Sequence, residues 1–241
     1  IIYIDYEVSQ DMNDILSYFT KQIDLNSLTK TSTIKAKSFL DPFSFNHAPN
    51  KNKTYLVIGK NLISVGLKSL GYHVTEVDGI NKDDLTIEGL IANGTKFDYV
   101  IASDEYLTYY TSEVDQINAI EHLVKITNIA FYTTLKDYRN MAANQRFFYE
   151  NFEVKTNSGD AVIVRKRDWN KSDKQRWLFR QWVIQGNKLF VADTVECRSM
   201  YFKQLAKFSS DAGAKDFQVE KKVMYKPLFS KAYEYIICIS V

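Results

Sequence analysis

A glycine and an aspartate follow two successive apolar runs, each at the point where the run ends. Gly59 closes the run 55–59, and Asp78 closes the run 71–78, 19 positions further along. A glycine turn and a strand-end acid that meet one nucleotide-like ligand are separated by roughly 20 residues. A carboxylate at that place can accept hydrogen bonds from both hydroxyls of a ribose. The alternative is that Asp78 is a turn or helix-cap residue.

Polar residues also follow the next two apolar runs, 97–103 and 128–135. The first group is Ser103, Asp104, Glu105 and Tyr106, and the second is Lys136, Asp137, Tyr138 and Arg139. Parallel α/β sheets bind ligands at the carboxyl ends of their strands, so we predict that both groups lie at one sheet edge. The second group is the expected substrate side. The alternative for the first group is that it caps the start of a helix.

Three further residues, Arg180, Trp182 and Arg198, lie in a region of alternating polar and apolar residues. They would close a pocket if hairpins fold over the sheet edge, because Arg binds carboxylates and Trp faces bind cations. The alternative is that each Arg lies on a solvated face and that the three tryptophans, which include Trp169 and Trp177, simply fill a second sheet.

Composition and charge exclude several other classes of protein. The chain has 31 Lys and Arg against 29 Asp and Glu, a net charge of +2, without the dense basic block that nucleic-acid binding requires. Cys197, Cys238 and the three scattered His form no metal or disulfide spacing. No serine-hydrolase elbow or phosphate loop is present. No run approaches the roughly 20 apolar residues of a membrane span, so we expect a cytoplasmic protein without a membrane partner.

The elements that must position these residues follow from the hydrophobic pattern. Strand-like runs alternate with helical spacing from 55 to 135, which predicts a parallel sheet with helices on its faces. Two hairpins are predicted next, with turns at 157–160 and 185–188. A helix over 200–213 and two terminal strands complete the chain.

The region before 55 has a different character. Helical spacing over 11–40 predicts a helical extension, and the proline-containing run 41–54 indicates a linker. We therefore predict an N-terminal region, 1–54, and one domain, 55–241, with a hairpin insert at about 137–196.

This element order resembles the class I S-adenosylmethionine (SAM) dependent methyltransferases, in their small-molecule, glycine and sarcosine-like branch. VIGKN with GYHVTEVD is similar to the glycine loop and ribose-binding acid of the family, and FDYVIASDEYL is similar to its fourth-strand motif. Four further segments resemble the C-terminal half of that branch: KDYRN, AVIVRKRDW, WLFRQWVI and CRSMYFKQLAKFSSDAGAKDF. The resemblance covers about 55–241. It implies an α/β fold with a Rossmann-like, mostly parallel sheet, an antiparallel C-terminal strand and an antiparallel hairpin insert.

The resemblance also implies an activity, N- or O-methylation of a small molecule with SAM as cofactor. Such an enzyme mainly orients the nucleophile toward the methyl group. The implied cofactor-binding residues are Gly59, Lys60, Asn61, Asp78, Gly79, Ser103, Glu105 and Tyr106. The implied substrate-binding residues are Lys136, Arg139, Arg180, Trp182 and Arg198. Tyr138 or Asp104 is expected to take a proton where one must be removed.

Two departures from the family pattern keep a second class open. Lys60 and Asn61 follow a single glycine where the family has GxGxG, and the interval from Asp78 to Phe97 is short. Loss of cofactor contacts would leave a catalytically inactive binding or structural module, of a kind that a virus or phage could encode. The 16 Tyr and 15 Phe would suit a protein interface as well as a pocket.

Overall fold

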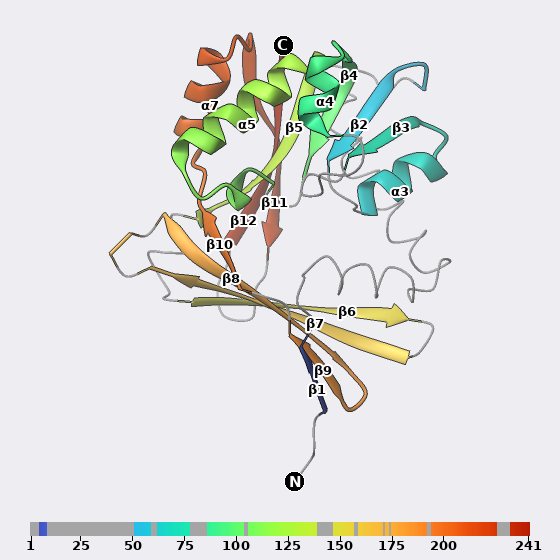
Figure 1. Cartoon of the computed structure of the whole chain (residues 1–241), viewed down its shortest axis with the longest axis vertical. Helices are drawn as coiled ribbons and strands as arrows, with labels where there is room; N and C mark the ends of the chain where they lie inside the picture. The colour runs from blue at the N-terminus through green and yellow to red at the C-terminus, as the bar shows by residue number, and fades with distance from the viewer. Residues whose placement is uncertain are drawn as a thin grey trace. The chain divides into compact units, whose positions relative to one another are not determined.

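The computed structural model describes residues 5–8, 51–58, 62–77, 86–103, 106–138, 147–156, 159–170, 172–173, 175–191, 194–225 and 232–241 (Figure 1). The chain forms two compact units. The parallel-sheet unit comprises Thr29–Asp137, Met200–Met224 and Tyr233–Val241. The antiparallel-sheet unit comprises Ile1–Leu28, Tyr138–Ser199 and Tyr225–Ala232.

The parallel-sheet unit is built on a 6-stranded sheet with the order β11-β12-β5-β4-β2-β3. Strands β2, β3, β4 and β5 pair in parallel, and β12 pairs with β5 in the antiparallel direction. This arrangement confirms the predicted fold class. The strands are β2 (Thr54–Ile58), β3 (His73–Val77), β4 (Phe97–Ala102), β5 (Thr127–Lys136), β11 (Asp216–Tyr225) and β12 (Ala232–Ser240).

Side chains of successive strand residues enter two separate cores, one on each face of this sheet. Leu56, Val100 and Phe131 belong to one core, whereas Tyr55, Tyr99 and Tyr132 belong to the other. The first core is covered by α4 (Ile87–Ala92), α5 (Glu113–Lys125) and α7 (Phe202–Asp211), and the second is contacted by α3 (Leu62–Ser69) (Figure 1). Burial on both faces explains why these strands are continuous apolar runs in the sequence.

The ends of the helices follow from local side-chain chemistry. Ser112 caps α5, because its hydroxyl accepts a hydrogen bond from the Asp115 amide at 3.0 Å. Gly94 ends α4 with a φ of 64°, and Gly213 ends α7 with a φ of 99°. Both glycines adopt the left-handed conformation that closes a helix C-terminus with backbone hydrogen bonds. The predicted glycine ends of these two helices are confirmed.

The antiparallel-sheet unit contains a second 6-stranded sheet, with the order β1-β9-β8-β7-β6 and with β10 paired to β8. Its strands are β1 (Asp5–Val8), β6 (Phe147–Thr156), β7 (Gly159–Trp169), β8 (Arg176–Gln185), β9 (Lys188–Val191) and β10 (Val195–Arg198). All its pairs are antiparallel except that of β1 with β9. The predicted antiparallel insert is therefore present.

Three details of this second sheet differ from the sequence prediction. The pattern did not predict β1 or β10, which are 4 residues each and too short to show a period. The first hairpin turn lies one residue earlier than predicted, because Thr156 pairs with Gly159. The second hairpin closes as predicted, with Gln185 paired to Lys188.

The predicted helical extension, 11–40, and most of the predicted linker lie outside the described residues.

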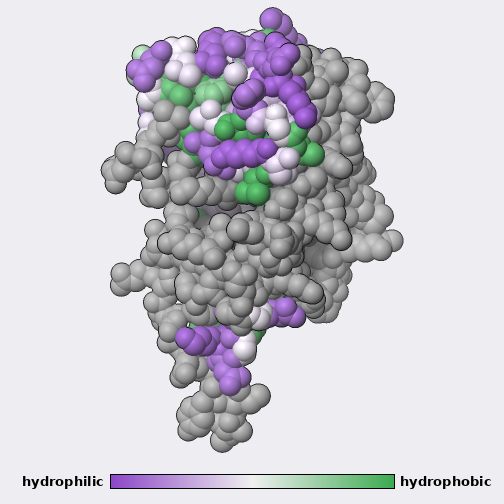
Figure 2. Space-filling model, turned by 90° about the vertical axis from the view of Figure 1, so that its right-hand side faces the viewer, coloured by the Kyte–Doolittle hydropathy of each residue, from purple (hydrophilic) through white to green (hydrophobic). Residues whose placement is uncertain are grey.

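The described surface is mixed in character. In the view of Figure 2, the coloured residues, which are the described ones, include hydrophilic residues with hydrophobic ones interspersed among them. Among the described residues, the exposed large hydrophobic side chains are Val114, Leu178, Ile184 and Val219. Leu178 and Ile184 share one face of β8, since they are separated by an even number of strand positions.

Candidate functional site

The carboxyl ends of β2, β3 and β4 lie side by side at one edge of the parallel sheet. Ile58, the last residue of β2, pairs with Val77, the last residue of β3. On the other side of β2, Val57 pairs with Ile101 of β4. The residues that directly follow these strands in the sequence are Gly59, Asp78 and Ser103. The direction of winding reverses between β2 and β4, and open α/β sheets bind ligands at such a point.

Ser103 is the described member of this edge. It is buried, and its carbonyl accepts a hydrogen bond from the Tyr106 amide at 3.2 Å. Next to it, the Thr133 hydroxyl of β5 donates to the Ala102 carbonyl at 2.8 Å. Sequence reasoning missed Thr133, although a threonine inside the apolar run 128–135 is a signal for a buried hydrogen bond. These contacts fix the backbone where β4 ends.

Tyr106 and Tyr110 form a hydrogen-bonded pair directly after this edge. Tyr106 begins the short 3-10 helix η1 (Tyr106–Tyr109), and its hydroxyl lies 2.6 Å from that of Tyr110. Burial raises the pKa of both phenols, and the neighbouring Tyr110 adds to the rise at Tyr106. Both rings pack against the core beneath α4, α5 and α7. The pair is therefore neutral at physiological pH, and its mutual bond occupies the Tyr106 hydroxyl.

The predicted substrate group divides between the two units. Lys136 ends β5 in the parallel-sheet unit, where it is buried and pairs in register with Glu234 of β12. Tyr138 belongs to the antiparallel-sheet unit and is 0% exposed. Its ring stacks on Trp177 with centroids 5.9 Å apart and an interplanar angle of 27°.

Trp177, on which Tyr138 stacks, lies on the opposite face of the sheet from Arg180 and Trp182. Burial along β8 alternates, with Trp177 on the buried side and Arg180 and Trp182 on the less buried side. The structure therefore does not bring these two predicted residues together with Tyr138. We call the side of the sheet with Trp177 the inner face and the side with Arg180 and Trp182 the outer face.

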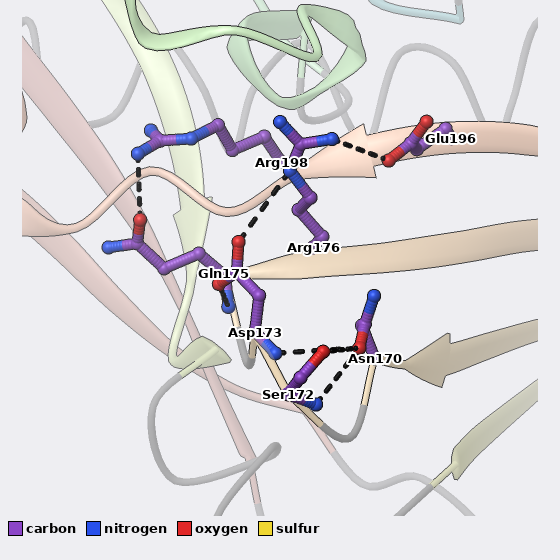
Figure 3. Close-up of polar contacts among 7 residues, drawn as sticks. All are labelled: Asn170, Ser172, Asp173, Gln175, Arg176, Glu196 and Arg198. Atoms are coloured by element: carbon purple, nitrogen blue, oxygen red, sulfur yellow. Dashed lines mark hydrogen bonds and ion pairs between the residues drawn. The ribbon is translucent and has the colours of Figure 1, made fainter.

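Arg198 lies in a polar cluster where β7 connects to β8 (Figure 3). Its guanidinium donates to the Gln175 side-chain oxygen at 2.7 Å. The neighbouring Arg176 is paired with Glu196 at 3.1 Å and with Asp173 at 3.6 Å. These contacts join β10 to the connection between β7 and β8. They give Arg198 a structural position within the sheet.

The inner face carries a cluster that sequence reasoning did not assign to the site. Its described members are Arg165, Arg167 and Trp169 of β7 with Trp177, Phe179 and Gln181 of β8. Arg167 is 1% exposed, and its guanidinium carbon lies 5.2 Å from the Trp177 ring centroid. Arg167 is therefore almost fully buried, whereas Arg180, on the neighbouring strand, is only partly buried. The expectation that Trp169 and Trp177 fill the second sheet is confirmed.

The remaining predicted site residues lie outside the described residues. They are Gly59, Lys60, Asn61, Asp78, Gly79, Asp104, Glu105 and Arg139. Their assignments stay predictions, as do the cytoplasmic and phage interpretations. In the described part of the chain, no three His, Cys, Asp or Glu side chains gather as metal ligands. None of the described helices combines the length and apolar character needed to cross a bilayer.

Comparison with known proteins identifies the fold. No protein-family model matches the sequence, and no curated protein matches it. Among solved structures, the chain is similar to the CcbJ methyltransferase from Streptomyces caelestis, with 12% identity, a TM-score of 0.56, and coverage of 84% of this chain and 94% of that chain. It is also similar to DesVI from Streptomyces venezuelae, with 10% identity, a TM-score of 0.51, and coverage of 94% and 98%. At these identities the similarity shows the fold, which is methyltransferase-like.

Proposed function

We propose that this protein is a SAM-dependent methyltransferase that methylates a nitrogen or an oxygen of a small molecule. The observation that carries the proposal is the strand order, in which β3 and β4 lie on opposite sides of β2. This order sets the carboxyl ends of three strands around a single ligand-binding edge. Polar residues follow each of these ends, as a nucleotide-like cofactor requires. The similarity to the fold of the CcbJ methyltransferase supports the same conclusion.

The register at this edge fits the proposed cofactor. Because Ile58 and Val77 are paired, Gly59 and Asp78 directly follow neighbouring positions. Asp78 would accept hydrogen bonds from the ribose hydroxyls, and Lys60 would pair with the carboxylate of the methionine part. The other proposed contacts are Asn61, Gly79, Ser103, Glu105 and the ring of Tyr106. When bound, SAM supplies a methyl group on a sulfonium, and the chain supplies orientation and exclusion of water.

The proposal also assigns residues to the methyl acceptor: some would take a proton from it and others would position it. Asp104 directly follows Ser103, so its carboxylate would take the proton that an acceptor loses. Tyr138 is the second proposed acceptor of that proton, and its stacking on Trp177 fixes its ring. Lys136 and Arg139 flank Tyr138 in the sequence and would position the small molecule. The case for three further substrate contacts is weaker. Arg180 and Trp182 lie on the outer face of β8, and Arg198 forms a hydrogen bond with Gln175 within the sheet.

The test is calorimetry of the whole chain with SAM and with its demethylated product. We expect micromolar binding of both ligands. Asp78→Ala should weaken it about 10- to 100-fold, the usual worth of hydrogen bonds to a charged acceptor. The matched control is Asp216→Ala, since Asp216 lies on β11 at the opposite end of the strand order.

Well-folded protein that gives no heat with either ligand would rule out cofactor binding. The alternative, an inactive methyltransferase-like module, would then be tested by light scattering of the same protein. A stable assembly that forms without SAM would support the module.

A further inference from the structure

The carboxylate of Glu76 joins two turns of one helix to the neighbouring strand. Glu76 lies on β3, and the Ser64 hydroxyl of α3 donates a hydrogen bond to its Oε1. The Lys68 ammonium, one turn further along α3, lies 2.6 Å from its Oε2. Ser64 and Lys68 are separated by one helical turn and so share one face of the helix. One carboxylate therefore contacts α3 in both its first and its last turn.

The two contacts differ in their surroundings. The side chain of Lys68 is 47% exposed and that of Glu76 is 30% exposed. Water and salt screen such a pair, so it contributes little to stability. Ser64, in contrast, is 0% exposed. Its bond to a charged acceptor is shielded from water on the helix side, so it is the stronger constraint on α3.

Apolar packing holds α3 against the sheet without fixing its direction. Ile63 and Leu67 of α3 are buried in the core on this face of the sheet. Burial of apolar area is non-directional, so it resists separation of helix and sheet more than a change in the tilt of the helix. The last turn is also held by the short connection to β3, where the Tyr72 amide donates to the Leu67 carbonyl at 3.1 Å. Ser64 lies in the first turn, at the end remote from this connection.

The first turn of α3 and the end of β3 adjoin the two segments proposed to bind the cofactor. Residues 59–61 alone separate the end of β2 from the start of α3. Asp78 directly follows the last residue of β3, and Glu76 is the last residue but one. The hydrogen bond from Ser64 to Glu76 thus joins the helix that follows one segment to the strand that precedes the other. A change in the tilt of α3 would alter the placement of these segments relative to each other.

We propose that Ser64 and Glu76 are positioning residues of the cofactor site, which hold the first turn of α3 in the orientation that SAM binds. The proposal rests on the proposed function, since the site that they position is the one assigned to SAM. Neither side chain needs to contact SAM. Without their hydrogen bond, binding has to restore this orientation, and the affinity falls by the free energy that this step requires. For one hydrogen bond to a charged group, that loss is about tenfold.

Calorimetry of the whole chain with SAM tests the proposal in two hydroxyl variants. Ser64→Ala removes the bond to Glu76 and should weaken SAM binding about tenfold. The matched control is Thr54→Val, because the Thr54 hydroxyl donates to the Asp98 carboxylate at 3.2 Å, at the opposite, amino end of β2. Thr54→Val should leave the SAM affinity unchanged. Equal SAM affinities in Ser64→Ala and Thr54→Val would overturn the proposal.

Variants of Glu76 separate the hydrogen bond from the charge. Glu76→Gln keeps an oxygen that accepts from Ser64 but loses the ion pair with Lys68, so it should weaken SAM binding by no more than about twofold. Glu76→Met has no acceptor and should weaken SAM binding as much as Ser64→Ala does. It also repeats the test if Ser64→Ala does not fold. Equal affinities of Glu76→Gln and Glu76→Met would contradict a role for the hydrogen bond.

Amide hydrogen exchange of the ligand-free chain reports on the helix without SAM. We expect faster exchange in the peptide 62–70 of Ser64→Ala than in the unchanged chain, and no such change in Thr54→Val. Unchanged exchange in Ser64→Ala would show that the bond does not hold α3, and the proposal would fall.

The unchanged chain keeps the two proposals apart. If it binds SAM, and Ser64→Ala binds SAM equally well, the positioning role falls and the methyl-transfer function stands. If the unchanged chain gives no heat with SAM, the methyl-transfer function falls, and the positioning role falls with it because no cofactor site is left to position.

Discussion

Replacing Thr133 with valine is expected to weaken the edge where β4 ends, at a cost that follows from one hydrogen bond. The Thr133 hydroxyl donates to the Ala102 carbonyl at 2.8 Å, and both residues are 0% exposed. Valine keeps the shape but removes the donor, so the free energy of unfolding should fall by about 1 kcal/mol. For a chain of this size, that loss lowers the melting temperature by about 2–4 °C.

The matched control is Thr127→Val at the other end of the same strand. The Thr127 hydroxyl is also buried and donates to the Leu123 carbonyl at 2.6 Å. Denaturant titrations should show a similar loss of stability in both variants. Calorimetry should show weaker SAM binding only in Thr133→Val, because Ala102 directly precedes Ser103 at the proposed site. Equal SAM affinities in the two variants would refute the assignment of this edge, and unchanged stability in Thr133→Val would refute the hydrogen-bond argument.

Three further predictions concern the parallel-sheet unit. Ser112→Ala should cost about 1 kcal/mol in a denaturant titration, because it removes the N-cap of α5. At Asp98, burial raises the pKa, but hydrogen bonds led by Thr54 outweigh this effect and hold the pKa below its ordinary value. Asp98 therefore stabilises the fold above about pH 4, and the stability difference from Asp98→Asn should vanish as the pH falls through the lowered pKa. Tyr106→Phe should cost about 1 kcal/mol, since Tyr110 loses its partner. Because burial raises the pKa of both phenols, their stabilisation should fall above about pH 10, as followed by ultraviolet absorbance.

Local patterns in the sequence were enough to predict the parallel-sheet unit. The run 55–58 is buried on both faces, and such a short apolar run bounded by turn residues favours a central strand. Ser112, Gly94 and Gly213 mark helix ends through contacts within a few residues, which a sequence pattern records directly. The position of the proposed ligand edge followed in turn, because parallel strands with helical connections place their carboxyl ends together.

Only the tertiary structure decided how the second sheet arranges its side chains. Arg167 and Arg180 are both arginines in alternating strands, yet Arg167 is almost fully buried and Arg180 lies on the outer face. Trp169 meets Trp177 because the two are register partners across β7 and β8. The alternation of polar and apolar residues fixes which residues share a face of a strand, but it does not say which face is buried. A register shift of one residue would move the side chains of each face to the opposite one. That choice depends on packing between residues distant in the sequence, which no local pattern contains.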